Sequence, residues 1–462
     1  MNPVATDTQR ASRQMPLPET AEGEVLLAHA EVMQHAQDAH RKGLLDLAEG
    51  LYHALLAARP DDVDALHFLG VLRHQRRDSV AAVDLIRRAL ELAPAEPGIW
   101  NNLGNVLLES RRVDEAIEAY ARCLALVPGF AEAHNNIGTI HRNRGEWEAA
   151  EAAYRRALEL QPERADTWHN LANLMLAQRR LREAVSYGCR AVTLKPDHAP
   201  SRKLLGLAHA TLGEFDKAAA VYREWLAEEP DNPVARHHLA ACTGESVPGR
   251  AADSYVEKTF DEFAQSFDAK LEQLQYRAPD LIGSALAAAC AAAAGRLDIL
   301  DAGCGTGLCG PIVRAHAREL TGVDLSAGML QRAQLRGVYD RLHKAELTHY
   351  LSAHEERWDV VLSADTLCYF GDLEGVFFAA LGALRAGGWL LFTVEALTEA
   401  SEDPFRLQAN GRYVHACDYV LRALAGAGFE EATIASEVLR KECGEPVAGW
   451  VVVARKPAGS RH

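Results

Sequence analysis

The stretch Leu297-Asp-Ile-Leu-Asp-Ala-Gly-Cys-Gly-Thr-Gly-Leu-Cys-Gly310 decides the fold of the second half of this chain of 462 residues. Apolar side chains at its start predict a short buried strand. Gly303, Gly305 and Gly307 then predict a tight turn that leads into a helix. Glycine allows positive φ and, because it has no Cβ, lets a ligand approach the main chain. Strand, turn and helix in this order are typical of the nucleotide-binding corner of an open α/β sheet.

A second short apolar run, Leu320 to Val323, ends in Asp324, about 20 residues after Asp301. In parallel α/β sheets the carboxyl ends of neighbouring strands meet at one edge, where ligands bind. An acid at this place can accept hydrogen bonds from both hydroxyls of a ribose. The two segments together therefore predict a nucleoside-binding site.

The motifs Asp301-Ala-Gly-Cys-Gly-Thr-Gly307 and Gly322-Val-Asp-Leu-Ser326 resemble those of class I S-adenosylmethionine (SAM) dependent methyltransferases. Within that family they are similar to the group that includes ubiquinone-biosynthesis and tellurite-resistance-type enzymes. The resemblance covers about residues 253–456 and implies a Rossmann-like α/β domain with a seven-stranded sheet and SAM as cofactor. A dinucleotide-binding protein is the alternative, but its glycines would follow G-x-G-x-x-G, whereas here every second residue of the turn is glycine.

The resemblance also implies which residues hold SAM, at the ends of the first four strands and in the segment before them. They are Tyr276, Arg277, Asp301, Gly303, Cys304, Gly305, Gly307, Asp324, Leu325, Glu346, Leu347 and Ser363. Arg277 is the expected partner of the SAM carboxylate, and Glu346 stands where an acid, more often Asp, receives the adenine amino group. The segment before the first strand is expected to fold over the cofactor as a lid, with Phe260, Phe263 and Phe267 excluding water.

A sulfonium methyl group is already activated, so an enzyme of this kind can work by positioning alone. If an oxygen or nitrogen acceptor must lose a proton, a general base assists. His415 is the first candidate, because it falls in the segment that faces the methyl group in related folds and titrates near neutral pH. Asp365 and Tyr413 are the further candidates, and a purely structural role for His415 stays open. The polar segment 395–415 around His415 is predicted to be an irregular substrate loop.

The first half of the chain is a repeat array with a period of 34 residues, as in tetratricopeptide repeats. Proline and alanine mark every unit: Pro60, Pro94, Pro128, Pro162, Pro196 and Pro230, with Ala48, Ala82, Ala116, Ala150, Ala184 and Ala218. The pattern predicts two helices per unit in six units, 29–62, 63–96, 97–130, 131–164, 165–198 and 199–232. A seventh apolar segment, 234–242, predicts a helix that covers the exposed end of the array.

Asparagines recur inside the middle repeats. Asn102, Asn136 and Asn170 occupy equivalent positions, and Asn105 and Asn173 each follow one helical turn later. An amide can both donate to and accept from a peptide backbone. The row is similar to the asparagine ladder of O-linked N-acetylglucosamine transferase, which implies binding of a polypeptide in the groove. The alternative is that these amides only bridge neighbouring helices.

Composition narrows the classes further. The chain is 48% hydrophobic and 24% charged, which is ordinary for a soluble globular protein, and it contains no run of 18 apolar residues that would span a membrane. A net charge of −15 argues against a nucleic-acid partner. Nine scattered cysteines show no metal-ligand spacing, and their odd number argues against a disulfide framework. We therefore expect a cytoplasmic protein with no metal and no membrane partner.

These features predict a multidomain protein, an all-α tetratricopeptide superhelix followed by an α/β methyltransferase domain. The expected boundaries are 1–28 for a disordered tail, 29–243 for six repeats plus a capping helix, 244–252 for a linker and 253–462 for the methyltransferase. The predicted activity is methyl transfer from SAM to an oxygen or nitrogen acceptor, with the repeats recruiting a polypeptide substrate or partner. The alternatives are a small-molecule methyltransferase that uses its repeats only for docking or oligomerisation, and a non-catalytic SAM-binding scaffold.

Overall fold

The computed structural model of the chain describes residues 22–290, 295–399, 402–442 and 444–458, in two compact units that divide between Thr167 and Trp168. Residues 1–21 of the predicted tail lie outside the described ranges. The first helix, α1 (Glu22–Arg41), already begins inside the segment predicted to be that tail. In the described ranges no helix combines the length and the apolar character that crossing a membrane requires.

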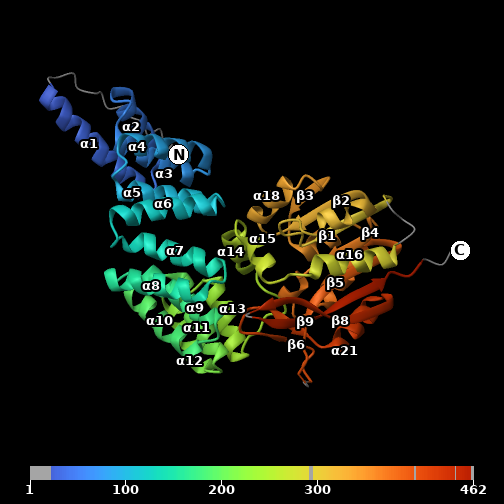
Figure 1. Ribbon diagram of the computed structural model, residues 1–462. Helices are drawn as coiled ribbons and strands as arrows, with labels where there is room; N and C mark the ends of the chain where they lie inside the picture. Colours follow the sequence, from blue (N-terminus) through green and yellow to red (C-terminus); the bar gives the residue numbers. More distant parts are fainter. Residues whose placement is uncertain (1–21, 291–294, 400–401, 443, 459–462) are drawn as a thin grey trace, which may run out of the picture. The chain divides into compact units, whose positions relative to one another are not determined.

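The first unit is a succession of antiparallel helix pairs, which confirms the predicted repeats (Figure 1). After α1 its helices are α2 (Leu45–Ala58), α3 (Val63–Gln75), α4 (Ser79–Leu92), α5 (Pro97–Glu109), α6 (Val113–Leu126), α7 (Ala131–Asn143) and α8 (Trp147–Leu160). Aspartate side chains cap the N-termini of α3 and α4. Asp62 accepts from the Ala65 amide at 2.8 Å, and Asp78 accepts from the Ala81 amide at 3.2 Å. Pro97, at the start of α5, needs no hydrogen-bond acceptor there.

The periodic small residues mark where the two helices of a unit cross. A Cβ added to Gly104 would lie 2.5 Å from the ring of Tyr120, and one added to Gly138 would lie 2.8 Å from the ring of Tyr154. Both tyrosines are fully buried. The 34-residue spacing of glycine and tyrosine therefore records a close helix crossing that recurs in several units, including Gly206 with Tyr222.

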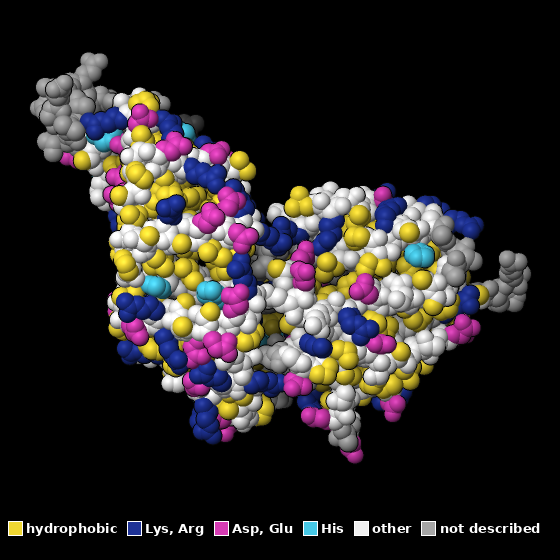
Figure 2. All heavy atoms as spheres, viewed as in Figure 1, with side chains coloured by type: hydrophobic (Ala, Val, Ile, Leu, Met, Phe, Trp, Pro, Cys, Tyr) yellow, Lys and Arg dark blue, Asp and Glu magenta, His cyan; other side chains and the backbone are white. Residues whose placement is uncertain are grey.

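Acidic and basic side chains are interspersed over the visible face of the molecule (Figure 2). Several form ion pairs between neighbouring repeats of the first unit, such as Arg144 with Asp114 at 2.9 Å and Arg88 with Asp61 at 2.8 Å. These side chains are largely exposed, so each pair contributes only about 0–1 kcal/mol to stability.

The second unit joins the last repeats to a sheet domain. The repeat helices are α9 (Ala165–Ala177), α10 (Leu181–Leu194), α11 (Ala199–Thr211), α12 (Phe215–Glu228) and the end helix α13 (Pro233–Thr243). The helices after them are α14 (Asp253–Phe263), α15 (Phe267–Gln273), α16 (Ala278–Ala289), α17 (Gly310–Val313), α18 (Ala327–Leu335), α19 (Leu347–Ser352), α20 (Glu374–Ala383) and α21 (Cys417–Ala427).

A mixed, Rossmann-like sheet forms the centre of that domain. Its strands are β1 (Leu297–Ala302), β2 (Ala317–Asp324), β3 (Arg341–Lys344), β4 (Trp358–Ser363), β5 (Leu384–Ala396), β6 (Phe405–Leu407), β7 (Tyr413–His415), β8 (Glu430–Glu442) and β9 (Glu445–Arg455). The order β3-β2-β1-β4-β5 is parallel, and β9 then pairs antiparallel with both β5 and β8. The predicted seven strands are present. Two short strands more, β6 and β7, occupy the segment that the sequence predicted to be irregular.

Both faces of the sheet are covered by helices, because its strands are apolar on both sides. Ile299 packs under α16, whereas its neighbour Leu300 packs toward the opposite face with α19, α20 and α21. Val360 and Val361 divide in the same way. This two-sided burial explains the continuous apolar runs in the sequence and leaves the strand ends as the open edge for ligands.

The segment predicted to be a linker, 244–252, is paired with the sheet domain. The carbonyl of Gly249 accepts from the amides of Gly371 at 2.9 Å and Asp372 at 2.8 Å, and the Ala251 amide donates to the Tyr369 carbonyl at 2.8 Å. The compact units therefore divide inside the repeat array and not at the predicted linker. The last repeats and the sheet domain form one body.

Candidate functional site

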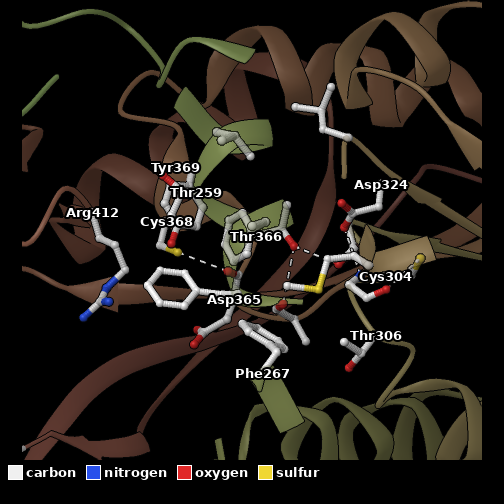
Figure 3. A pocket seen from close by; sticks show the side chains of 18 of the residues that line it. Thr259, Phe267, Cys304, Thr306, Asp324, Asp365, Thr366, Cys368, Tyr369 and Arg412 are labelled. Atoms are coloured by element: carbon white, nitrogen blue, oxygen red, sulfur yellow. Dashed lines mark hydrogen bonds between the residues drawn. The ribbon is translucent and has the colours of Figure 1, made fainter. Parts of the chain in front are cut away.

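A cavity of about 410 Å³ lies at the carboxyl ends of β1, β2 and β4 in the second unit. This volume is typical of small-molecule sites. Three parts of the chain line it: the strand ends with their turns, the lid formed by residues 253–276, and a wall that includes Arg412 and Arg440. In the close view, Asp324 and Arg412 lie on opposite sides with Asp365 and Thr366 between them (Figure 3).

The three glycines of the turn have different roles. A Cβ on Gly303, at φ +78°, would lie 2.2 Å from the Thr366 hydroxyl, and one on Gly307, at φ +83°, would lie 2.8 Å from the Tyr339 ring. These two glycines allow close packing. Gly305, at φ +54°, has nothing within 4 Å of an added Cβ and lines the cavity, so it leaves the main chain open to a ligand.

Asp324 at the end of β2 faces the same cavity. Its Oδ2 accepts from the Gly305 amide at 2.9 Å, and its Oδ1 accepts from the Ser326 amide at 2.8 Å. Burial raises the pKa of this carboxyl, and the main-chain donors oppose that shift by stabilising the ionised form. Each carboxylate oxygen has lone pairs beyond these bonds, so Asp324 can also accept from the hydroxyls of a ribose.

Asp301 at the end of β1 also lines the cavity and is 1% exposed. Burial raises the pKa of Asp301 to about 7, against the opposing effect of the Tyr339 hydroxyl, which donates to Oδ2 at 2.6 Å. Burial therefore favours the protonated form of Asp301 more than it would for an exposed aspartate.

Most of the other residues predicted to hold the cofactor reach the cavity. Tyr276, Cys304, Leu325, Glu346 and Leu347 all line it. The carboxylate of Glu346 also begins α19 by accepting from two main-chain amides, those of Thr348 at 3.0 Å and His349 at 2.8 Å.

Three of the predicted cofactor residues are not in the lining of the cavity. The guanidinium of Arg277 is half exposed and bonds to the Val438 carbonyl at 3.3 Å on β8, which does not support its expected role at the SAM carboxylate. The Ser363 hydroxyl donates to the Ala302 carbonyl at 2.8 Å and ties β4 to β1. The third, Gly307, is a packing position.

The lid is aromatic where it faces the cavity, as the resemblance implied. Phe260, Phe263 and Phe267 all line it, and Phe260 makes edge contacts with Phe267 at 5.9 Å and Tyr369 at 5.4 Å between ring centroids. The lid also forms a hydrogen bond to the part of the site that contains the glycine turn. Asp268 accepts from the Thr306 hydroxyl at 2.5 Å, next to the glycine turn. An apolar, bonded lid excludes water from the site.

Two of the three predicted catalytic residues lie away from the cavity. His415 is fully buried, its Nε2 donates to the Phe370 carbonyl at 2.8 Å, and burial lowers its pKa to about 4. Tyr413 is also fully buried and donates to the Pro248 carbonyl at 2.7 Å. Neither lines the cavity, because the β6–β7 pair turns both side chains into the packing around it. The structure therefore favours the structural alternative for His415.

Asp365 does line the cavity and belongs to a charge network that sequence reasoning missed. Its Oδ2 accepts from Arg440 at 2.5 Å, and Arg440 also pairs with Glu395 and with Glu442 at 2.8 Å. Arg412 forms ion pairs with the same two glutamates, Glu395 and Glu442. Arg440 and Glu442 alternate along β8, which places them on one face of the strand. The spacing of Arg440 and Glu442 in the sequence indicates that they share one face of a strand. It does not reveal which segment of the chain that face contacts.

The predicted polypeptide-binding asparagines form hydrogen bonds among the repeats. In the first unit the Asn136 amide donates to Asn105 at 2.8 Å and to Asn101 at 3.4 Å, and Asn102 bonds to His67 at 2.8 Å. In the second unit Asn173 bonds to His169 at 2.8 Å. These contacts account for part of the 34-residue spacing. Among the described residues, Oδ1 of Asn102 and Nδ2 of Asn105 have no partner, which leaves one acceptor and one donor on the same helix face.

The cavity fits SAM on the chemistry of its donors and its shape. Gly305 leaves main chain open, the carboxylate of Asp324 lies beside it, and an apolar aromatic wall closes the other side. Asp324 and the turn would hold the sugar, Glu346 and Leu347 would border the base, and the lid would cover the methyl group.

Comparison with known proteins agrees with both halves of the chain. Residues 300–392 match a methyltransferase domain family, and residues 33–97, 101–165 and 169–233 match the tetratricopeptide repeat. Methyltransferase-like protein 27 of Homo sapiens is 33% identical over 183 residues, which cover 39% of this chain and 70% of that protein.

Two further relatives match the sheet domain over shorter stretches. A ubiquinone biosynthesis O-methyltransferase of Hydrogenovibrio crunogenus is 29% identical over 99 residues, 21% of this chain and 41% of that protein. A malonyl-[acyl-carrier protein] O-methyltransferase of Acetivibrio thermocellus is 32% identical over 100 residues, 21% of this chain and 35% of that protein. The chain thus spans less than half the length of these two relatives.

The change Asp324→Ala should abolish SAM binding. Two hydrogen bonds to a charged group are each worth about 1.5–3 kcal/mol, so isothermal titration should show an affinity loss of ~100-fold or more. Asp340→Asn is the control, because Asp340 also accepts a main-chain amide, that of Leu320 at 2.7 Å, but does not line the cavity. Micromolar SAM affinity in Asp324→Ala would show that this is not the ribose acid.

The change Asp301→Asn should stabilise the protein at neutral pH. The raised pKa means that, between pH ~4 and ~7, the unfolded state releases a proton that the folded state keeps, so wild-type stability falls as pH rises through that window. The variant has no carboxyl to titrate at this position, so its free energy of unfolding does not fall in this way. The free energy of unfolding of the variant minus that of wild type should therefore grow by on the order of 4 kcal/mol from pH 4 to pH 7.5. Urea denaturation at several pH values measures it.

Asp340→Asn provides a control of opposite sign for that experiment. Although burial acts to raise the pKa of Asp340, the Leu320 amide and Arg314 hold it below its usual value. Its ionised form stabilises the folded state above the unfolded pKa, and the variant should lose stability at neutral pH. An advantage of Asp301→Asn that stays constant from pH 4 to pH 7.5 would contradict the assignment.

Proposed function

This chain belongs to the SAM-dependent methyltransferases, and on that premise we propose that it methylates an oxygen atom of an acceptor that its tetratricopeptide repeats help to recruit. The observation that supports the proposal best is the open main chain of Gly305 beside the carboxylate of Asp324, at the wall of the cavity. A sulfonium nucleoside requires this combination of a bare main chain and a ribose acceptor.

SAM supplies a methyl group that is already activated for transfer. The chain's own residues then have to orient the acceptor, exclude water and hold charge in place. Phe260, Phe263 and Phe267 provide the apolar cover, and the Asp365–Arg440 pair fixes the floor of the cavity. Asp365 is the one predicted base that lines the cavity, and Arg440 already occupies its Oδ2. This arrangement favours transfer by positioning.

The choice of oxygen rests on the similar proteins and on the loop after β4. Two relatives are named as O-methyltransferases, one in ubiquinone biosynthesis and one that acts on malonyl-[acyl-carrier protein]. The loop Ser363-Ala-Asp-Thr366 lacks the Asn/Asp-Pro-Pro-Tyr/Phe motif that is typical of enzymes that methylate adenine N6 or glutamine amides. A hydroxyl or a carboxylate oxygen is therefore the acceptor we propose.

The repeats support a polypeptide partner through their amides. Asn102 and Asn105 lie one helical turn apart on α5, and in the part of the chain that the structure describes Oδ1 of the first and Nδ2 of the second are unpaired. A peptide group presents one N–H donor and one C=O acceptor, so this pair can engage a main chain regardless of its side chains.

Full-length protein incubated with methyl-labelled SAM and a desalted cell extract should transfer label to an acceptor and release S-adenosylhomocysteine. Label that alkali removes as methanol indicates a carboxylate ester. Alkali-stable label that hydriodic acid releases as methyl iodide indicates a methyl ether, whereas label stable to both treatments indicates a nitrogen acceptor and contradicts the proposal. Asp324→Ala serves as the blank reaction. The proposed activity would be contradicted if the wild type binds SAM but transfers label to no fraction, at extract concentrations that support other methyltransferases.

Replacing Asn102, Asn136 and Asn170 together by Ala should weaken acceptor recruitment about tenfold and leave SAM affinity within twofold of wild type. The readouts are the extract concentration that gives half-maximal labelling and isothermal titration with SAM. Arg122, Arg156 and Arg190 recur at the same spacing on the exposed side of α6, α8 and α10, and their triple Ala variant is the matched control. Unchanged recruitment would leave the asparagines with a structural role alone.

A further inference from the structure

The end helix of the repeat array, α13, holds a turn of the sheet domain through two histidines. His237 Nε2 donates to the Gly411 carbonyl at 2.9 Å, and His238 Nδ1 donates to the Ala409 carbonyl at 3.0 Å. Residues 174 and 171 positions apart in the chain are thereby joined. We call residues 408–412 the clamped turn.

The clamped turn is tight and pressed against the repeats. The Gly411 amide donates to the Gln408 carbonyl at 2.8 Å, and the Arg412 amide donates to the Asn410 side chain at 2.9 Å. Gly411 has φ +88°, and a Cβ there would lie 2.3 Å from the Tyr255 hydroxyl. Only glycine fits a positive φ with so little space, so the turn approaches α13 this closely because residue 411 has no Cβ.

The two histidines are themselves fixed by aromatic neighbours. His237 stacks on Tyr255 with ring centroids 4.0 Å apart, and His238 stacks on Tyr222 at 5.5 Å. Both histidines are buried, at 5% and 1% exposure. Burial lowers the pKa of His238 to about 3 and lowers that of His237, so each ring is neutral and carries one N–H. Because a carbonyl can only accept, that N–H faces the turn.

The clamped turn supplies two side chains to the wall of the cavity, Asn410 and Arg412. Arg412 is held by Glu395 at 2.5 Å through Nε and by Glu442 through Nη2, while its Nη1 has no hydrogen-bond partner among the described residues. The same wall receives Lys203 from α11, in the last repeat. The end of the repeat array therefore contributes to the cavity in two ways, directly through Lys203 of the last repeat and indirectly through the clamp formed by the end helix. In the close view this end lies away from Asp324 (Figure 3).

We infer that the end of the repeat array is part of the acceptor site: His237 and His238 of the end helix position the clamped turn so that Asn410 and Arg412 present their polar groups to the methyl acceptor. This inference rests on the proposed methyl transfer and goes beyond it, because it assigns to the repeat array a role in the reaction cavity in addition to recruitment. The histidines act as positioning residues, since neither of them lines the cavity.

The two histidines do more than pack against the clamped turn, because each donates a hydrogen bond to one of its main-chain carbonyls. A main-chain carbonyl that loses its donor away from water is destabilised, and the turn would then be free to move with Arg412. Packing alone would be preserved by phenylalanine, which keeps the ring stack on Tyr255 or Tyr222. The donor alone would be preserved by glutamine at 237, which mimics Nε2–H, and by asparagine at 238, which mimics Nδ1–H.

The test uses the full-length chain with His237→Phe and His238→Phe, each compared with its amide counterpart, His237→Gln and His238→Asn. His209→Phe is the control, because His209 bonds Glu214 at 2.7 Å within the last repeat and does not touch the turn. Hydrogen exchange over residues 405–415 reports the turn. Labelled methyl transfer from SAM into a graded series of cell extract reports the acceptor site, and isothermal titration with SAM reports the cofactor site.

The phenylalanine variants should exchange at least tenfold faster in residues 405–415 and need at least fivefold more extract for half-maximal labelling. Their SAM affinity and maximal rate should stay within twofold of wild type, and the amide variants and His209→Phe should match wild type in all readouts. Exchange that stays within twofold of wild type overturns the inference. Equal behaviour of phenylalanine and amide variants also overturns it, because ring shape would then be what matters.

Gly411→Ala tests the clamp from the other side and remains available if a phenylalanine variant does not fold. The added Cβ meets the Tyr255 hydroxyl, so it should produce the same rise in exchange and in half-saturating extract. A normal labelling curve for this variant would contradict the inference. If wild-type protein binds SAM but transfers no label, the proposed function fails, while the exchange measurement still decides whether the histidines hold the turn.

Discussion

The site depends on the hydrogen bond that joins Asp324 to the glycine turn. It connects the ends of β1 and β2, since the Gly305 amide after the first strand donates to the carboxylate that ends the second. Burying a carboxylate is costly unless main-chain donors satisfy it, and here two do. The turn can approach Asp324 only because Gly303 packs against Thr366 without a Cβ. One constraint thus fixes the shape of the turn and the place of the charge.

A second buried electrostatic element holds the opposite wall. Arg440 joins acids from the ends of three strands, Asp365 after β4, Glu395 on β5 and Glu442 on β8. Removing one partner from such a network leaves a buried charge uncompensated, at a cost of about 3–5 kcal/mol. The wall is therefore stiff, and Arg412 extends it to the clamped turn. The end helix α13 bonds to the sheet domain at this turn. The end of the repeat array and the sheet domain therefore belong to one compact unit.

Sequence reasoning succeeded where local chemistry carries the information. Gly305 and Asp324 were predicted to border the ligand because positive φ and a strand-terminal acid are readable from spacing alone. The repeats were predicted correctly, because residues that mark them, such as Gly104 and Tyr120, contact each other within one unit. His415 shows the limit. It was predicted to lie in an irregular substrate loop, but short strands in the segment 395–415 turn its side chain into the core.

By itself, the sequence determined the tetratricopeptide array and the Rossmann-like methyltransferase domain, and it predicted the glycine turn and Asp324 as the cofactor corner. Each of these depends on contacts between residues in one unit or in adjacent strands. Only the tertiary structure decided that Arg440 and Arg412 line the cavity, that Arg277 does not, and that α13 holds the turn at Gly411. Such contacts join residues as far apart as 174 positions. Their partners are set by how whole elements pack, and no spacing along the chain encodes that.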